Sequence, residues 1–515
     1  MSTTVRPPLP LYLLACLFSL LALFSLWYSL GRPVKLADAA SPTHKLQCVS
    51  YTPFDKDQSP YDQPLQLRPA RIDADLALLA KRFQCIRTYS MTGLEGVPAL
   101  ARKHGLKVML GAWVNANPKD TAHEVQALID AANANPDVVT SVIVGNEVLL
   151  RKEITGGQLV KLIAQVKAAI KQPVTYADVW EFWEQYPEVA PAVDFLTIHL
   201  LPYWEDNPKG IDQALAHVAR IRQDFGERFA PKDILIGETG WPSEGRQRET
   251  ARPSRVNEAK FLRNFVFMAE QRGWHYNLIE AFDQPWKRAN EGAMGGHWGI
   301  YDADRQDKGI LAGRVSNLPS WPRWLALSAA LFFVGLYLAG PSPRARSTLG
   351  VPLLAAFGAG SIGLWAHQSW VDSRFIEEWL WAGLIGLLNL VVLAHATLAM
   401  AKPSGWRQHW FNWLEARARF WLTASGFVGA VLMLAMVFEP RYRSFPYPAI
   451  MLPALVYLVR PVAARRGEVT LLLAIVALGI PVQLYLEGLR NPQAWAWAAA
   501  SAVMAAALVR ASRTR

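Results

Sequence analysis

The sequence has few cysteines and lacks the motifs of several enzyme classes. Three cysteines in 515 residues are too few for a disulfide-rich scaffold. Histidine and cysteine do not cluster at the spacing of metal ligands, so we expect neither a metal nor another cofactor. The chain also has no glycine-rich phosphate loop, no Asp-x-Asp motif at a predicted strand end and no Gln-x-x-Arg-Trp motif. These absences argue against an enzyme that uses a nucleotide-sugar donor.

Charged residues make up only 18% of the chain, and its excess of positive charge lies almost entirely in the last third. From Trp321 onward there are 17 Lys and Arg against 7 Asp and Glu, whereas the rest of the chain has 36 basic and 35 acidic residues. The part before Trp321 therefore has no basic excess of the kind that a nucleic-acid site needs. We expect no nucleic-acid partner.

Long apolar runs are absent between residues 31 and 320 but frequent on either side. A bilayer-spanning helix needs about 20 mostly apolar residues. One candidate span precedes this region, at residues 9–30, and seven follow it: 324–340, 349–366, 380–400, 421–438, 449–459, 471–486 and 494–509. The sequence therefore predicts four parts: an N-terminal anchor (1–31), a linker (32–44), a globular domain (45–318) and a membrane domain of about seven helices (319–515).

The distribution of Lys and Arg in the short loops predicts the orientation, since cytoplasmic loops are enriched in both. After Trp321, twelve basic residues fall in loops on one side of the predicted spans and four in loops on the other. This places both termini, with Arg6, in the cytoplasm and residues 31–320 outside it. Ala37-Asp38-Ala39 resembles a signal cleavage site. The preceding apolar run is longer than the usual signal-peptide core of about 7–15 residues, which favours an uncleaved anchor.

Between residues 45 and 301, strand-like runs alternate with helix-like segments. The predicted strands are residues 46–51, 85–89, 107–112, 138–146, 173–176, 195–199, 234–238 and 277–282, and amphipathic helices are predicted at 72–83, 121–134, 155–170, 211–225 and 257–272. Eight such units in this length predict an α/β fold, a (β/α)8 TIM barrel, with an open doubly wound sheet as the alternative. Cys48 and Cys85 lie in consecutive strands; two small core residues are favoured over a disulfide.

Two carboxylates follow predicted strands of this barrel. Glu147 stands in Val-Gly-Asn-Glu-Val (144–148), after the fourth strand, and Glu238 stands in Ile-Gly-Glu-Thr-Gly-Trp-Pro-Ser (236–243), at the end of the seventh. Barrel enzymes carry their catalytic groups at this rim, and glycoside cleavage uses a pair of carboxylates. The pair therefore predicts an enzyme that acts on glycosidic bonds. His199 ends the sixth strand, either as a rim residue or as a buried barrel histidine.

At these residues the chain resembles glycoside hydrolase family 17, the β-1,3-glucanase and β-1,3-glucanosyltransferase family, over about residues 45–310. Four motifs carry the resemblance in family order: Ile-Arg-Thr-Tyr-Ser (86–90), Val-Gly-Asn-Glu (144–147), Gly-Glu-Thr-Gly-Trp-Pro (237–242) and Glu-Ala-Phe-Asp-Gln-Pro-Trp-Lys (280–287). The chain departs from plant-type members in having Leu201 for Tyr, and Gln284 where Glu is common. Details of sugar binding therefore cannot be copied from the plant enzymes.

The resemblance implies a retaining mechanism in which Glu147 is the acid/base and Glu238 the nucleophile. We expect Glu147 to start protonated, with its pKa raised by burial and neighbouring negative charge. The resemblance further implies that Asn146 binds the sugar 2-hydroxyl. Other candidate substrate-binding residues are Tyr89, which could orient the nucleophile or be an ordinary rim aromatic, and Tyr203 and Trp241, which could stack on sugar. Glu280 and Lys287 resemble the polar pair of the family's last strand, with a solvated salt bridge as the alternative.

A barrel joined to a membrane domain resembles bacterial proteins implicated in making or branching periplasmic β-(1,3;1,6)-glucans. This implies a membrane-tethered transglycosylase in the bacterial inner membrane, with the barrel in the periplasm and a β-1,3-glucan donor, a glucan acceptor and membrane lipid as partners. The alternatives are a tethered hydrolase of the same family and a non-catalytic component for glucan binding or export. Association with glucan synthesis or export machinery remains open.

Overall fold

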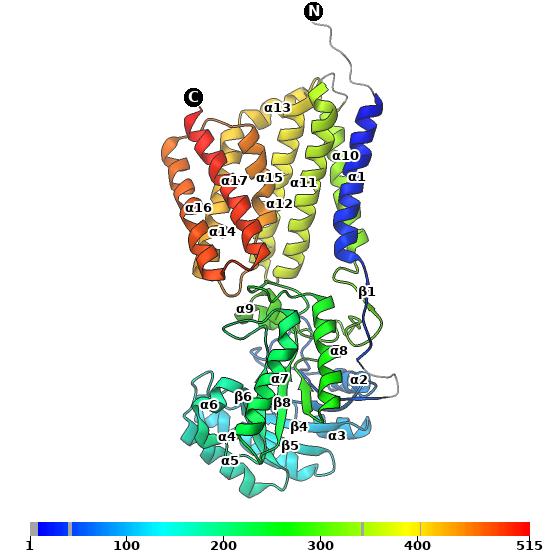
Figure 1. Ribbon diagram of the computed structural model, residues 1–515, viewed down its shortest axis with the longest axis vertical. Coiled ribbons are helices and arrows are strands. Elements are labelled where there is room, and N and C mark those ends of the chain that lie inside the picture. The colour runs from blue at the N-terminus through cyan, green and yellow to red at the C-terminus, as the bar shows by residue number, and fades with distance from the viewer. Residues whose placement is uncertain (1–8, 40–43, 341–344, 402, 515) are drawn as a thin grey trace, which may run out of the picture. The chain divides into compact units, whose positions relative to one another are not determined.

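The computed structural model describes residues 9–39, 44–340, 345–401 and 403–514 (Figure 1). Arg6, Arg344, Lys402 and Arg515, which contribute to the predicted orientation, lie outside these residues. The chain divides into two compact units. One comprises residues 34–244 and 250–315, and the other comprises residues 1–33, 245–249 and 316–515.

The first unit is a closed barrel of eight parallel strands. Each strand pairs with the next in the chain, and the last pairs with the first. The strands are β2 (Leu46–Ser50), β3 (Phe83–Arg87), β4 (Lys107–Ala112), β5 (Val139–Asn146), β6 (Val174–Val179), β7 (Leu196–Leu200), β8 (Ile234–Thr239) and β9 (His275–Leu278). Closure confirms the predicted TIM barrel and excludes the open sheet. Outside it, β1 (Val34–Lys35) pairs antiparallel with β10 (Arg314–Val315).

Helices connect the strands and cover the barrel. They are α2 (Pro69–Leu79), α3 (Val97–Lys103), α4 (Pro118–Ala134), α5 (Gly156–Ala169), α6 (Trp180–Gln185), α7 (Ile211–Arg228), α8 (Arg255–Gln271) and α9 (Arg288–Glu291), with short 3-10 helices η1 (Pro187–Val189), η2 (Pro285–Lys287) and η3 (Ala293–Gly296). Several begin at strong caps: Asn117 accepts a hydrogen bond from the Lys119 amide, and Thr155 forms a capping box with Gln158. Their apolar faces and the outward-facing strand residues form one large core.

Inside the barrel, a layer of small and apolar side chains lies below the predicted site. It contains Cys48, Cys85, Met109, Ile143, Ala177, Phe195 and Leu235. Cys48 and Cys85 are paired residues of β2 and β3 and form a disulfide, so the favoured reading of two separate core residues was wrong. Because side chains alternate along a strand, the residue two positions beyond Cys85, Arg87, faces inward in the next layer up.

Two strands carry an irregularity at a glycine one or two residues before a predicted catalytic acid. In β8, Ile236 pairs with Ile198 and Glu238 pairs with His199, so Gly237 is an extra residue in the ladder. In β5, Ile143 pairs with Thr175 and Asn146 with Ala177, and Gly145 in this interval has a φ of +87°. A bulge re-aims the side chains that follow it. Each irregularity therefore affects the direction of the acid beyond it, Glu147 in one case and Glu238 in the other.

The second unit contains a helical bundle. Its helices are α1 (Leu9–Gly31), α10 (Trp321–Ala339), α11 (Ala345–Asp372), α12 (Ile376–Ala401), α13 (Trp406–Glu415), α14 (Ala418–Phe438), α15 (Tyr447–Val459), α16 (Arg466–Glu487) and α17 (Pro492–Arg513). Among the described residues, seven of these are long and apolar enough to cross a membrane: α1, α10, α11, α12, α14, α16 and α17.

Helix α15, at the predicted span 449–459, is shorter than a helix that crosses a bilayer. Its 13 residues rise about 20 Å, whereas a bilayer core is about 30 Å thick. Prolines limit the helix at both ends, with Pro446 at its N-cap and Pro461 just after Arg460. Most of its side chains are nevertheless buried among the other helices. Within this unit, α1 begins and α17 ends at the same end of the bundle (Figure 1).

Candidate active site

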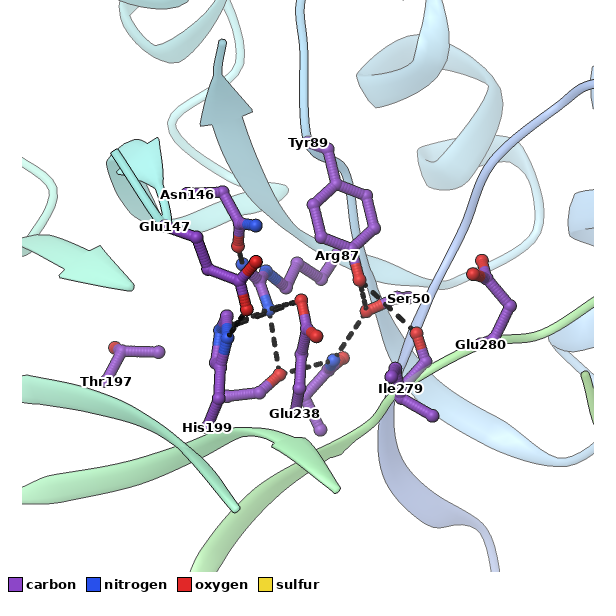
Figure 2. Close-up of polar contacts among 12 residues, drawn as sticks. Ser50, Arg87, Tyr89, Asn146, Glu147, Thr197, His199, Glu238, Ile279 and Glu280 are labelled. Atoms are coloured by element: carbon purple, nitrogen blue, oxygen red, sulfur yellow. Dashed lines mark hydrogen bonds and ion pairs between the residues drawn. The ribbon is translucent and has the colours of Figure 1, made fainter. Parts of the chain in front are cut away.

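Glu147 and Glu238 meet at the carboxyl ends of the barrel strands (Figure 2). Glu238 lies within β8, and its side chain is 8% exposed, while Glu147 follows β5 directly with a side chain 25% exposed. One carboxylate oxygen from each, together with a ring nitrogen of His199, lies within 4.8 Å of the others. The two acids predicted from separate motifs therefore share one site.

Arg87 of β3 connects this pair to its surroundings. Its guanidinium is fully buried and donates from Nη1 to the carbonyl oxygen of Gly237 at 2.8 Å and to Oε1 of Glu238 at 3.1 Å. Its Nη2 donates to Oδ1 of Asn146 (Figure 2). Arg87 therefore joins Glu238 and Asn146 in one buried network and fixes the amide orientation of Asn146.

His199 of β7 lies between the two carboxylates. Its ring is fully buried, with Nδ1 2.9 Å from Oε1 of Glu147 and Nε2 3.6 Å from Oε1 of Glu238. Nη1 of Arg87 is 3.5 Å from Nε2. His199 is thus a buried barrel residue, and at the same time part of the site. Glu147, His199 and Glu238 converge closely enough to be potential metal ligands. One of them, Glu238, already has a positively charged partner in Arg87.

The pKa of Glu147 shifts in the direction opposite to the prediction. Burial raises it, but the hydrogen bond from His199 and the nearby charges of His199, Arg151 and Arg87 outweigh burial, so the pKa lies below its ordinary value. The expectation considered burial and negative neighbours but missed the histidine that faces the carboxylate. Asp178 shows the effect that was expected for Glu147: burial and the charge of Glu147 raise its pKa to about 7.

The turn that carries Glu147 is held in an unusual backbone conformation. Glu147 has a φ of 52°, in the left-handed region. Two side chains of β6 bind the amides that follow: the hydroxyl of Tyr176 accepts from Leu149 N at 3.0 Å, and Oδ2 of Asp178 accepts from Leu150 N at 3.4 Å. These contacts stabilise a conformation that a non-glycine residue rarely adopts.

Tyr89 lies at the site, but its hydroxyl contacts groups other than Glu238. The hydroxyl oxygen is 2.9 Å from Oγ of Ser50 and 3.3 Å from the carbonyl oxygen of Ile279 (Figure 2). Nδ2 of Asn277 also donates to Ser50 at 2.8 Å and to the carbonyl of Gly237 at 2.9 Å. Tyr89 is therefore linked to strand β8 through Ser50 and Asn277.

Glu280 and Lys287 form the polar pair expected from the last motif. Nζ of Lys287 donates to Oε2 of Glu280, and Oγ1 of Thr52 donates to Oε1 at 3.0 Å. Glu280 is 1% exposed. Burial raises the pKa of Glu280 despite this pairing. The salt bridge is buried, so it differs from the solvated one considered as the alternative.

The prediction for Tyr203 and Trp241 was wrong, because both rings are fully buried. Tyr203 packs edge-on against Trp241 at 6.0 Å between ring centroids, and Trp241 donates from Nε1 to the carbonyl of Arg252 at 3.0 Å. They support the loops and offer no open face to a sugar. Sequence alone located them in rim loops but could not show which aromatic rings pack inward. Trp286 is less buried and lies edge-on to the 68%-exposed Tyr61, at 5.9 Å.

The sequence reasoning assigned no role to Arg87 and left His199 undecided. Arg87 stood within a quoted motif, and an arginine in the middle of an apolar strand is a signal that it has a buried partner. His199 shares its inward-facing phase with Phe195 and Thr197 of the same strand. Neither partner could be named, since closure of the barrel brings β3, β5, β7 and β8 together.

Paired carboxylates at the carboxyl rim of a (β/α)8 barrel define a glycosidase. Residues 48–299 match the model of the BtgE/BtgC glycoside hydrolase domain. A glucan 1,3-beta-glucosidase of Arthroderma benhamiae is 29% identical over 259 residues, which cover 46% of this chain and 83% of that protein. A glucan 1,3-beta-glucosidase of Schizosaccharomyces pombe is 29% identical over 237 residues, which cover 42% of this chain and 72% of that protein.

The solved structures similar to this chain include a glycoside hydrolase family 17 beta-1,3-glucanosyltransferase from Rhizomucor miehei. It is 27% identical, covers 52% of this chain and 96% of its own, and superposes with a TM-score of 0.45. The matches to the BtgE/BtgC domain and to glucan 1,3-beta-glucosidases support a barrel of the β-1,3-glucanase-like type.

Proposed function

We propose that this protein is a membrane-tethered retaining transglycosylase that acts on β-1,3-glucan, with Glu238 as nucleophile and Glu147 as acid/base. The spacing of the two acids carries the proposal. Retaining glycosidases have carboxyl groups about 5–5.5 Å apart, and inverting enzymes about 6.5–9.5 Å, to leave room for water. Carboxylate oxygens of Glu147 and Glu238 lie within 4.8 Å, which supports the retaining arrangement.

In the first half of the reaction, a carboxylate oxygen of Glu238 attacks the anomeric carbon and the glycosidic C–O bond breaks. Glu147 gives a proton to the leaving oxygen. Arg87 orients Glu238 through the hydrogen bond to Oε1. Because Arg87 binds Oδ1 of Asn146, the amide nitrogen of Asn146 is the end left to donate to the sugar 2-hydroxyl, a contact that strengthens in the transition state.

In the second half, an acceptor hydroxyl attacks the glycosyl ester, loses its proton to Glu147 and releases Glu238. Water competes at about 55 M, and well-oriented reactants reach effective molarities of about 10⁵ M or more, so a bound glucan can win. We assign part of the acceptor or donor site to the buried Glu280–Lys287 pair and the neighbouring Trp286 and Tyr61. Attack by a 6-hydroxyl would create a 1,6 branch.

The membrane helices support a role beside the site where glucan is exported. We propose that residues 1–31 and 319–515 lie in the inner membrane of a bacterium and that residues 45–318 form a periplasmic catalytic domain joined by the linker 32–44. The Cys48–Cys85 disulfide supports an oxidising compartment. The start of α1 and the end of α17 at one end of the bundle support a cytoplasmic location for both termini. Membrane lipid and glucan synthesis or export machinery are the proposed partners.

A tethered hydrolase is the second candidate. The relatives from Arthroderma benhamiae and Schizosaccharomyces pombe bear the name of glucosidases, which favours water as the final acceptor. The two candidates share every step up to the glycosyl-enzyme. They differ only in what attacks it.

The test is a linkage-resolved product analysis. Full-length protein in lipid nanodiscs is incubated with borohydride-reduced β-1,3-glucan oligomers, and Glu238→Gln serves as the blank. Products longer than the substrate, with the number of glycosidic bonds conserved, are expected of a transglycosylase. Shorter products alone would establish the hydrolase, and no turnover of any β-1,3-linked donor would contradict both. Fluorescence of a C-terminal fusion that matures only in the cytoplasm tests the orientation.

A further inference from the structure

We propose that His199 stores the catalytic proton in the resting enzyme and passes it to Glu147 when a glycosidic bond is to be broken. The proposal rests on the assignment of Glu147 as acid/base. It arises from a conflict in the site: the first step needs a protonated Glu147, yet the surroundings of Glu147 favour its ionised form. A proton held by the partner of Glu147 removes the conflict.

The geometry allows one imidazolium to serve both acids. A doubly protonated ring would donate from Nδ1 to Oε1 of Glu147 at 2.9 Å and direct Nε2–H toward Oε1 of Glu238 at 3.6 Å. The ring is fully buried, so a charge on it must be compensated by neighbours. Two carboxylates supply that compensation.

Groups from every neighbouring strand bear on the ring. Three acids contribute negative or potentially negative charge: Glu147 from the end of β5, Asp178 from the end of β6 and Glu238 from β8. Arg87 of β3 lies 3.5 Å from Nε2 and opposes protonation of the ring. Arg87 is itself bound to Glu238 and to Asn146. Its charge is therefore already paired, which leaves the Glu147 carboxylate as the partner of His199.

The proton balance closes over one turnover. At rest the pair is imidazolium and carboxylate. As the sugar ring is attacked, the proton moves from Nδ1 of His199 to Glu147, and Glu147 passes a proton to the leaving oxygen, which leaves the pair neutral imidazole and carboxylate. In the second half, the acceptor hydroxyl gives its proton to Glu147. A proton then passes from Glu147 back to Nδ1 of His199. No other acid or base is consumed.

The test is the pH dependence of kcat/KM for full-length enzyme in nanodiscs with reduced laminarihexaose. The alkaline limb reports loss of the proton needed for bond cleavage. If His199 holds it, His199→Asn, which can donate a hydrogen bond to Glu147 but cannot carry the proton, moves that limb to lower pH by about one unit or more, because a carboxyl alone loses its proton earlier than an imidazole. If His199 only lowers the pKa of Glu147 by hydrogen bonding, the same variant leaves the limb in place where asparagine replaces that hydrogen bond, and raises it where asparagine does not. An unmoved or raised limb overturns the proposal.

A second substrate separates proton supply from general damage. A 2,4-dinitrophenyl β-laminaribioside has a leaving group that needs no proton, so His199→Asn should release dinitrophenol with a kcat/KM within about fivefold of wild type. Thr197→Val, on the same strand, is the matched control and should leave the alkaline limb in place. A wild-type enzyme inactive on both substrates would instead contradict the proposed function.

One measurement needs no variant to fold. Loss of a proton from an imidazolium is strongly endothermic, whereas ionisation of a carboxyl group has an enthalpy close to zero. The wild-type alkaline limb should therefore move to lower pH as temperature rises. A limb that does not move between 10 and about 40 °C would show that a carboxyl holds the proton, and would overturn the proposal.

Discussion

Arg87 of strand β3 donates two hydrogen bonds from Nη1 to strand β8: one to Oε1 of Glu238 at 3.1 Å and one to the carbonyl oxygen of the preceding Gly237 at 2.8 Å. One guanidinium thus contacts both the side chain and the backbone of the residue pair that includes the proposed nucleophile. Its side chain is 1% exposed and that of Glu238 8%. The ion pair is consequently sheltered from solvent, and charge interactions are stronger in such a buried environment than in water.

Arg87→Lys should abolish most of the activity while keeping the charge. A lysine cannot donate to Glu238, Gly237 and Asn146 together, and each hydrogen bond lost to a charged group costs about 1.5–3 kcal/mol. We expect kcat to fall at least about 100-fold and the Tm of the barrel to fall by several degrees. Arg68→Lys, at an arginine 68% exposed beside Asp55, is the control and should change neither quantity. Near-normal kcat in Arg87→Lys would remove Arg87 from the proposed machinery.

Gly237→Ala should damage the site through the bulge. A Cβ at position 237 would lie 2.3 Å from Cγ2 of Thr197 and 3.3 Å from Cδ2 of His199, so the strand or both side chains must move. We expect the free energy of unfolding to fall by about 1–3 kcal/mol and kcat to fall at least about tenfold. Gly157→Ala, where no atom lies within 4 Å of the added carbon, should be neutral. Wild-type kcat and stability in Gly237→Ala would show that the bulge is not needed.

Loss of the Cys48–Cys85 disulfide should weaken the barrel more than its chemistry. The bridge closes a loop with a sequence separation of 37, for which cross-links of this kind contribute about 2–4 kcal/mol. The Cys48→Ala/Cys85→Ala double variant should unfold at a lower temperature, as should wild type in strong reductant, with turnover retained well below that temperature. Cys16→Ala removes the free thiol in α1 and is the control. Equal Tm values for oxidised and reduced wild type would contradict this expectation.

Glu258 should make barrel stability fall as the pH rises. Burial, only partly offset by Lys308, raises its pKa to about 8 from an ordinary 4.5. The folded barrel therefore keeps a proton that the unfolded chain releases, and the free energy of unfolding falls by about 1.4 kcal/mol per pH unit between pH about 4.5 and 8. Thermal unfolding across this range should show that slope in wild type, and Glu258→Gln should reduce it. An unchanged slope in the variant would refute the assignment.

The sequence was sufficient for the barrel and for the position of both acids. Strand and helix periodicity located eight strands within a few residues, for example 195–199 against Leu196–Leu200, because buried parallel strands are short apolar runs. The last strand was placed less well, at 277–282 against His275–Leu278, since the functional motif continues the apolar run beyond the ladder. Gly145 and Gly237, inside strand patterns, were also a readable sign of bulges.

The contacts between distant strands were not predictable. Nothing in the sequence pairs Arg87 with Glu238 or His199 with Glu147, because residues 151 and 52 positions apart meet only when the barrel closes. The direction of the Glu147 pKa shift depended on the second of these contacts. The burial of Trp241 likewise depends on how its loop folds back on Tyr203.

The left-handed backbone of Glu147, with φ of 52°, sets backbone stability against the proposed catalysis at this residue. Glutamate in that conformation costs about 1–2 kcal/mol, whereas glycine adopts it freely. Glu147→Gly would remove that cost, but it would also remove the proposed acid/base and the carboxylate that faces the buried ring of His199. Survival of heating alone therefore does not report on turnover at position 147, and any selection on this protein must include turnover.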